Sequence, residues 1–208
     1  MIEEKNMKRK AVKFGIVTFL TIVVSFFDNF FTYIGSPDLS REANPLVSTL
    51  GFNWTGLLVS NIIILILVIM LYYYSFIRFE PATIKCNNLR EYYSMLYFNE
   101  PNRFKETLYK LPKNKIIWRY VLACLGFCFG IVVIVFRARC VIEWLMYLYN
   151  QEMFKAYCNL IKPISYTTVF GRLDMIILVM ISVLVLVYFW FYREYRKNKT
   201  ALMKINNE

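Results

Sequence analysis

The sequence has no histidine among its 208 residues. This absence excludes histidine acid–base catalysis, imidazole metal ligands and Ser-His-Asp triads. The five cysteines form no metal-binding pattern. Cys124 and Cys128 lie one helical turn apart in an apolar run, where thiols usually pack as small apolar groups. Cys140 and Cys158 share one connection between apolar runs and could pair in an oxidising compartment, whereas Cys86 is expected to be a reduced thiol.

Long apolar runs, in contrast, dominate the chain, and 58% of its residues are hydrophobic. Four runs each have about the length that crosses roughly 30 Å of hydrocarbon as a helix; they cover residues 14–34, 54–77, 116–136 and 173–192. Barrel strands are excluded because the runs do not alternate in polarity. No small-x-small cleavage pattern follows the first run, so we interpret it as a retained span. The sequence predicts one all-α membrane domain, residues 1–208, with four transmembrane helices.

Positive charge is concentrated on one side of the predicted spans. Five lysines and arginines precede the first span, nine lie from Arg78 to Arg119, and five lie from Arg193 to Lys204. The outward loops, residues 35–53 and 137–172, balance acids and bases when the ends of the adjoining spans are included. This bias predicts that both termini and the loop 78–115 are cytoplasmic. The net charge of +11 therefore reflects topology rather than nucleic-acid binding, and the expected partner is the lipid bilayer.

The first outward loop is rich in residues that form turns and helix caps. Asn44 followed by proline suits an N-cap and a first helical position. We therefore expect a short helix or re-entrant segment over Pro45–Leu50. Gly51 is expected to end this segment, and Asn53 to cap the next helix.

The cytoplasmic loop contains two amphipathic stretches, LREYYSMLYF and NRFKETLYKL. Aromatic and leucine residues alternate there with lysine and arginine, as expected for inner-face helices in an anionic headgroup region. A surface that binds a partner protein is the alternative. Beyond the third span, helical periodicity continues to about Tyr149, so that helix is expected to extend past the bilayer or to bend along its surface.

Polar side chains form a stripe along the first span. At 100° per residue they fall within one arc of the helix; they are Thr18, Thr21, Ser25, Asp28, Asn29 and Thr32. The stripe should face protein or water, because lipid offers no hydrogen-bond partners. Threonine and serine can bond their own helix carbonyls, but a carboxyl within a span is usually functional or paired inside the bundle. Two states are open for Asp28: ionised beside a cation, or protonated.

Arg137 is the expected cationic partner of Asp28. It shares one narrow face of the third helix with Arg119, Ala123, Gly126 and Gly130, and the two glycines form a GxxxG close-packing motif. A face that meets neighbouring helices directs Arg137 into the bundle. Arg139 falls on the opposite side of the helix, where Glu143 is a local partner at i+4.

Further polar residues lie near the outer ends of the spans. Asp38, Glu42 and Asn44 in the first outward loop, and Arg172 and Asp174 at the start of the fourth span, join Asp28, Asn29 and Thr32 as candidates for one polar pocket. Carboxylate and amide oxygens suit Mg²⁺ or Ca²⁺, whereas arginines suit an anionic headgroup or a phosphate. The alternative is a structural cluster, in which the loop acids cap short helices and Arg137 neutralises Asp28.

The segment Asp28-Asn29-Phe30-Phe31-Thr32 and the following loop GSPDLSREANPL resemble a family of small prokaryotic four-span membrane proteins of unknown function. The shared features are an Asp-x-x-x-Thr helix end and a Glu-x-Asn-Pro loop, so the resemblance covers the first span and its loop. It implies the cytoplasmic membrane of a prokaryote. It marks Asp28, Thr32, Glu42, Asn44 and Pro45 without naming a reaction.

Three functional hypotheses follow from these patterns. In the first, the polar cluster of a non-catalytic membrane protein supports the fold, contacts lipid, or joins an assembly with another membrane protein or a second copy. In the second, an outer-face enzyme acts on a lipid-linked phosphate or peptide, with Asp28 or Glu42 as base or metal ligand and Arg137 as anion clamp. A small-solute or ion carrier is least favoured, because only the first span has a continuous polar stripe and no inverted repeat is visible.

Overall fold

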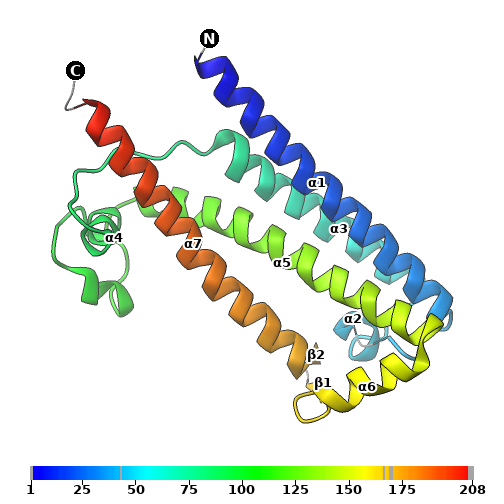
Figure 1. Ribbon diagram of the computed structural model, residues 1–208. Coiled ribbons are helices and arrows are strands. Elements are labelled where there is room, and N and C mark those ends of the chain that lie inside the picture. Colours follow the sequence, from blue (N-terminus) through cyan, green and yellow to red (C-terminus); the bar gives the residue numbers. More distant parts are fainter. Residues whose placement is uncertain (1, 43, 166, 169–170, 206–208) are drawn as a thin grey trace.

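The computed structural model describes residues 2–42, 44–165, 167–168 and 171–205, which form a helical bundle with both termini at one end (Figure 1). Its long helices are α1 (Ile2–Gly35), α3 (Trp54–Tyr73), α5 (Ile116–Tyr149) and α7 (Leu173–Ile205). A π-helical turn, η1 (Tyr74–Arg78), continues α3. Four stretches are long and apolar enough to cross a membrane: Met7–Gly35, Trp54–Arg78, Ile116–Tyr149 and Leu173–Met203. The predicted all-α fold with four apolar helices is confirmed, and the third helix does continue to Tyr149.

Short elements connect the long helices. They are α2 (Pro45–Ser48), α4 (Leu89–Phe98), the 3-10 helix η2 (Phe104–Leu108), α6 (Gln151–Ile161), and the antiparallel strands β1 (Thr167–Thr168) and β2 (Gly171–Arg172). The second amphipathic stretch of the loop between α3 and α5 was expected to be a helix comparable to α4, and this expectation is wrong in extent. Asn99 and Asn102 both adopt left-handed backbone conformations, with φ of 58° and 63°. These two residues separate the stretch from α4. Only five residues of the stretch form η2, and Tyr109, which follows it, has a non-helical backbone conformation.

Side-chain caps organise the first loop largely as predicted. The Asn44 Oδ1 atom accepts a hydrogen bond from the Leu46 backbone N–H at 3.0 Å, which caps α2. Gly51 has a left-handed φ of 68° and lies beyond the end of this short helix. Asn53 accepts a bond from the Gly56 N–H at 3.0 Å and caps α3. The short helix therefore exists, although it ends at Ser48 rather than at Leu50.

Helix α5 is central to the bundle and packs against α1, α3 and α7. The two glycines of its GxxxG motif lie against α3. A Cβ atom on Gly126 would lie 2.3 Å from the Leu71 carbonyl oxygen, and one on Gly130 would lie 1.4 Å from the Tyr72 ring. The predicted close packing at these glycines is confirmed. Arg119, at the start of the same face, remains exposed.

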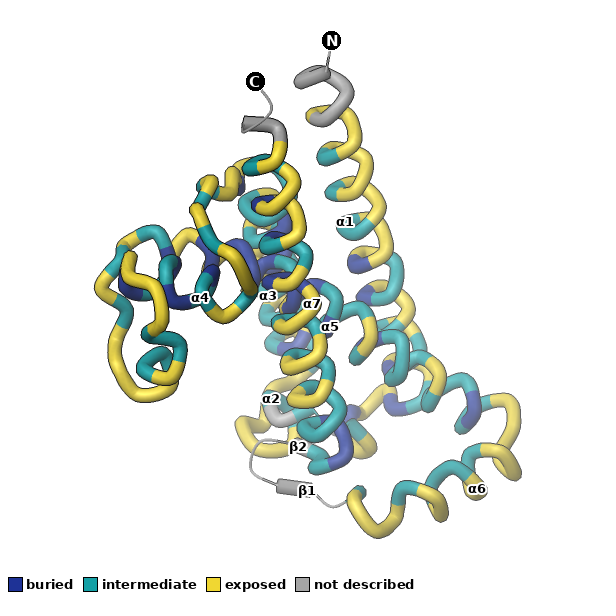
Figure 2. Tube along the Cα trace, turned by 60° about the vertical axis from the view of Figure 1, so that its left-hand side comes forward, coloured by how far each residue is buried: buried dark blue, intermediate teal, exposed yellow. Residues whose placement is uncertain are grey.

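An aromatic core joins α4 to α5 and α7 at the end of the bundle that holds the termini. Tyr92 and Leu96 of α4 are buried against Tyr120 of α5 and Trp190 of α7. The buried face of α4 is visible in Figure 2. Protein therefore covers the apolar face of α4, which the sequence pattern alone assigned to lipid.

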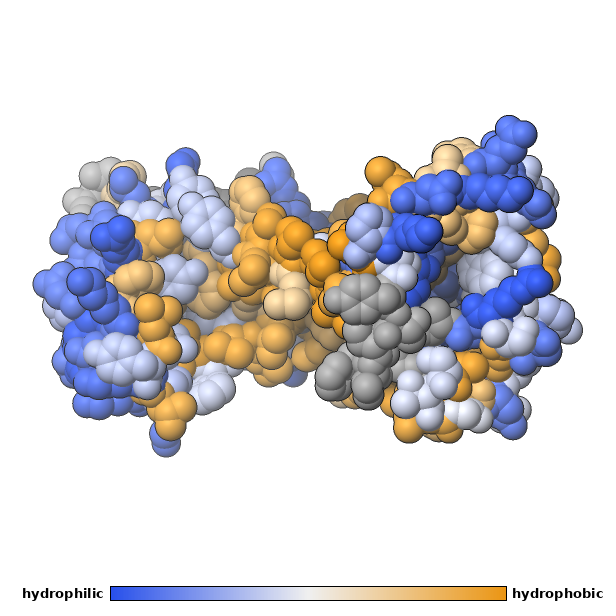
Figure 3. All heavy atoms as spheres, turned by 90° about the horizontal axis from the view of Figure 1, so that it is seen from below, coloured by the Kyte–Doolittle hydropathy of each residue, from blue (hydrophilic) through white to orange (hydrophobic). Residues whose placement is uncertain are grey.

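The outer surface of the bundle is apolar along the middle of its length. Large hydrophobic side chains of α3 are exposed there, among them Ile62, Ile63, Ile66, Leu67 and Met70. Figure 3, which views the molecule from below, shows an apolar region in the middle of that face, between two polar ends. Such a surface is compatible with a multi-pass protein in contact with a lipid bilayer.

Candidate functional site

An ion pair between Asp28 on α1 and Arg137 on α5 forms the centre of a polar network inside the bundle. The Arg137 Nη1 atom lies 2.8 Å from the Asp28 Oδ2 atom, and both side chains are more than four-fifths buried. Arg137 also donates through Nη2 to the Asn61 side-chain oxygen at 2.9 Å. Asn61 in turn donates to Asn29 at 2.8 Å. The expected pairing of Asp28 with Arg137 is therefore present, and Asn61 extends it to α3.

The remaining polar side chains on this face of α1 also point into the protein. Thr21, Ser25 and Thr32 are buried. The Thr21 hydroxyl donates to the Val17 carbonyl of its own helix at 2.8 Å and lies 2.9 Å from the Tyr72 hydroxyl. The polar stripe therefore faces protein, as predicted.

A second ionic network surrounds Arg139, on the opposite side of α5. Arg139 pairs with Glu143 at 3.2 Å and also contacts the Asp174 carboxylate. Arg172 bridges the same two acids, at 2.9 Å from Glu143 and 3.0 Å from Asp174. The Tyr157 hydroxyl bonds to both Glu143 and Arg139. This network connects α5, α6, β2 and α7.

Two members of this network lie outside the candidate spans, and their surroundings shift their titration. Burial raises the pKa of Tyr157, and its hydrogen bond to the Glu143 carboxylate acts in the same direction. Burial by itself lowers the pKa of Arg172. The hydrogen bond to Asp174 and the charge of Glu143 outweigh that effect, so the pKa of Arg172 is raised. The Glu143 and Asp174 carboxylates therefore keep Arg172 as a charged partner over the whole physiological pH range.

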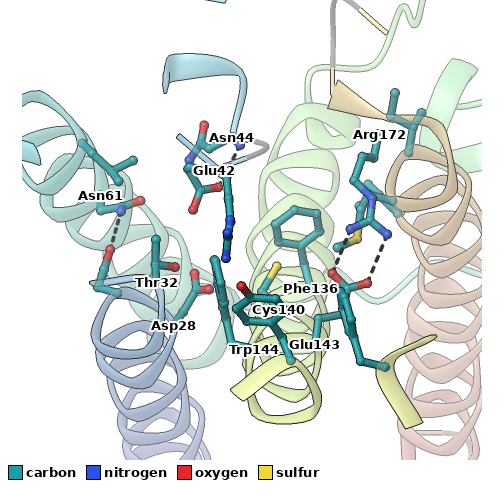
Figure 4. A pocket seen from close by; sticks show the side chains of 18 of the residues that line it. Asp28, Thr32, Glu42, Asn44, Asn61, Phe136, Cys140, Glu143, Trp144 and Arg172 are labelled. Carbon is teal, nitrogen blue, oxygen red and sulfur yellow. Dashed lines mark hydrogen bonds and ion pairs between the residues drawn. The ribbon is translucent and has the colours of Figure 1, made fainter. Parts of the chain in front are cut away.

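A cavity of about 560 Å³ lies between the two networks. Figure 4 shows Asp28, Thr32 and Glu42 on one side of it, and Glu143 with Arg172 on the other. Phe136, Cys140 and Trp144 of α5 lie between these groups. The α7 wall is apolar and consists of Met175, Ile176, Val179 and Met180. One cavity therefore combines ionic groups with a hydrophobic surface.

The first loop covers this cavity and is held by its own hydrogen bonds. The Glu42 Oε1 atom accepts from the Asn44 N–H at 2.8 Å. The Ser36 hydroxyl oxygen accepts from the Arg41 N–H at 3.0 Å, and the Trp54 indole donates to the Pro37 carbonyl at 2.6 Å. These bonds place Arg41, Glu42 and Asn44 along the cavity wall.

The structure brings only part of the predicted polar cluster together. Asp28, Asn29, Thr32, Glu42 and Asn44 line the cavity, as does Arg172. Asp174 belongs to the Arg139 network and is not a lining residue, because its carboxylate turns toward the two arginines. Asp38 is exposed and accepts hydrogen bonds from Ser40 and Ser36, which lower the pKa of Asp38. The expectation that Asp38 and Asp174 join the pocket is wrong.

Arg137 was expected to act as an anion clamp in the pocket, but the structure places it elsewhere. Its guanidinium is occupied by Asp28 and Asn61, and it does not line the cavity. Arg41, which sequence reasoning passed over, does line it, with its guanidinium 5.3 Å from the centre of the Tyr147 ring. Asn61 was also missed. An amide within an otherwise uncharged span was a usable signal, because buried amides need partners.

A metal ion or a disulfide would each require a particular arrangement of acidic side chains or thiols. In the described part of the chain, no group of three or more cysteine, aspartate or glutamate side chains is arranged to hold a metal ion. Cys140 and Cys158 are free thiols, so the possible disulfide between them is not formed. Comparisons with family models, with curated proteins and with solved structures gave no match.

Proposed function

We propose that this chain is a multi-pass protein of a prokaryotic cytoplasmic membrane, with cytoplasmic termini, and that its outward cavity binds the headgroup of a phosphate-bearing lipid or lipid-linked molecule. The observation that carries this proposal is the composition of the cavity. Charged side chains from the first loop, α1 and α5 face the same space as the apolar wall of α7. An amphiphilic ligand likewise has a charged half and an apolar half.

Arg41 is the cation that this proposal assigns to the phosphate. Arginine binds phosphate oxygens through several parallel N–H donors. In the described part of the chain, no carboxylate lies within ion-pair distance of Arg41, and its guanidinium instead faces the Tyr147 ring. Arg172 and Arg137, in contrast, are already paired with acids. Arg41 therefore offers donors to a ligand without breaking an internal pair.

The apolar wall accounts for the other half of the ligand. Ile176, Val179 and Met180 follow one side of α7, and Met180 is 60% exposed at the outer surface. An acyl or prenyl chain lying along this wall would reach the surrounding lipid without crossing a polar layer.

Native mass spectrometry of the purified protein tests the proposal. The wild type should retain phospholipid, and Arg41→Gln should lose most of it. Val179→Trp, which fills the apolar wall, should also lose it. Arg196→Gln is the matched control, because Arg196 is an exposed arginine near the opposite end of the bundle. Equal lipid retention in all four proteins, with unchanged melting temperatures, would show that the cavity is not the binding site.

A second candidate function is an enzyme that acts on the same class of ligand. The observation that favours it is the presence of two carboxylates, Asp28 and Glu42, on one cavity wall. A carboxylate beside a bound phosphate can act as general base or hold a divalent ion. Glu42→Gln should then abolish turnover of a lipid-linked phosphate, and any Mg²⁺ binding, while lipid retention stays unchanged. Retained turnover in this variant would exclude Glu42 as the base.

A further inference from the structure

Three of the most exposed apolar side chains of the protein lie together in sequence, immediately before α5. Leu108, Tyr109 and Leu111 are 84%, 72% and 86% exposed. They lie outside the four candidate spans. Three such side chains within four residues form an exposed cluster, and the core formed by α4 is only a few residues away.

Hydrogen bonds and ion pairs hold the backbone that presents these side chains. Arg103 and Lys110 both pair with Glu106, at 2.5 Å and 2.8 Å. The N–H groups of Lys113 and Asn114 both donate to the Tyr97 carbonyl at 3.0 Å, which ties the segment to the end of α4. The leucines are therefore displayed by a fixed turn.

Lysines surround the exposed apolar residues. Lys105, Lys110, Lys113 and Lys115 lie within the segment, with Glu106 as the only acid among residues 105–115. Apolar side chains flanked by lysines match a membrane interface, where the former enter the acyl boundary and the latter meet anionic headgroups. A docking surface for a folded protein would instead be expected to be depleted of lysine.

The position of the segment agrees with a lipid partner. It runs directly into α5, whose first turns carry Trp118 with 58% exposure, a typical interfacial residue. The segment and α4 lie at the end of the bundle that holds both termini, beside the beginning of α5 (Figure 1). The apolar side chains are thus near the level at which the spans leave the hydrocarbon.

We infer that residues 105–115 form a membrane-inserting turn, in which Leu108, Tyr109 and Leu111 enter one leaflet and the lysines bind anionic lipid headgroups. Protein covers the apolar face of α4, so this turn, rather than α4, supplies the lipid contact of the cytoplasmic loop. The inference does not depend on ligand binding in the outward cavity.

Depth-dependent fluorescence quenching in nanodiscs tests this inference. Leu111→Cys is labelled with an environment-sensitive dye in a protein that also carries Cys86→Ser and Cys158→Ser. The same protein without the new cysteine measures background labelling. Lys85→Cys is the matched control, because Lys85 is an exposed residue of the same loop. Symmetric nanodiscs of phosphatidylcholine, with or without phosphatidylglycerol, make the result independent of orientation.

The label at position 111 should be quenched by lipid-borne quenchers several-fold more strongly than the label at position 85. Phosphatidylglycerol should strengthen the quenching. Substituting Lys105, Lys113 and Lys115 by glutamine should remove that dependence on anionic lipid; Lys110 is kept because it pairs with Glu106. A label at position 111 that remains in water, with quenching equal to the control, overturns the inference and would leave a protein partner as the explanation for the exposed leucines. Quenching that is strong but insensitive to phosphatidylglycerol and to the lysine substitutions overturns the assigned role of the lysines.

Discussion

The Asp28 carboxylate and the Arg137 guanidinium, 109 positions apart in sequence, meet at 2.8 Å between α1 and α5. Lipid solvates neither of the two charges, so each side chain is more stable paired with the other than exposed to the bilayer. The pair therefore fixes the register of the two helices. It also supports the wall of the cavity, since Asp28 is a lining residue.

Breaking this pair on one side should be costly. Asp28→Asn or Arg137→Gln leaves a buried group without its partner, and we expect each to lower the unfolding free energy by about 3–5 kcal/mol. The double substitution should cost less than the sum of the two. Denaturant unfolding in detergent measures this, with Asp38→Asn as the control, because Asp38 is exposed. Additive effects would indicate that the two residues act independently.

The contact between Gly130 and Tyr72 gives a second prediction. A Cβ at position 130 would lie 1.4 Å from the tyrosine ring, so Gly130→Ala must separate α5 from α3 or displace the ring. We expect a loss of roughly 1–3 kcal/mol of stability. Gly15→Ala in α1 is the control, because no atom lies within 4 Å of its added Cβ, and it should be neutral or stabilising by up to about 1 kcal/mol. Equal effects of both substitutions would argue against close packing of α5 on α3.

The ion pairs of Glu106 predict a pH dependence for the loop between α3 and α5. Hydrogen bonds from Arg103 and then Lys110 lower the pKa of Glu106 from 4.5 to about 2. A carboxyl with a lower pKa in the folded state stabilises that state above pH 4.5, and this contribution disappears as the pH falls toward 2. Glu106→Gln should therefore lower the melting temperature at pH 7, and the difference from wild type should vanish near pH 2. A difference that stays constant across this range would contradict the pairing.

Features set by local sequence were predictable. The four apolar helices follow from run length and hydropathy, and α5 continues past its apolar core because its helical periodicity does. The capping roles of Asn44 and Asn53 depend only on neighbouring residues. The contact between Asp28 and Arg137 was also predictable, because a charge in a span needs a partner and the GxxxG face indicated which arginine points inward.

Other features depended on how the helices are placed in space. Asp174 was expected beside Asp28, but the position of α7 brings it to Arg139 and Arg172 instead. Asn61 entered the network only because α3 lies beside both α1 and α5. The spacing of residues in the sequence does not specify how the helices are placed relative to one another.

The amphipathic loop also combines a feature set by local sequence with one that depends on packing. Its pattern of aromatic and basic residues correctly indicated an apolar face on α4, yet periodicity does not tell whether protein or lipid covers such a face. Packing decided that Tyr92 and Leu96 meet Tyr120 and Trp190, while Leu108 and Leu111 stay outside. Sequence by itself determined where the four long helices are and which face of α1 is polar, because backbone hydrogen bonding and hydrophobicity act locally along the chain. Only the tertiary structure decided which polar groups share a cavity, because that depends on contacts between distant segments.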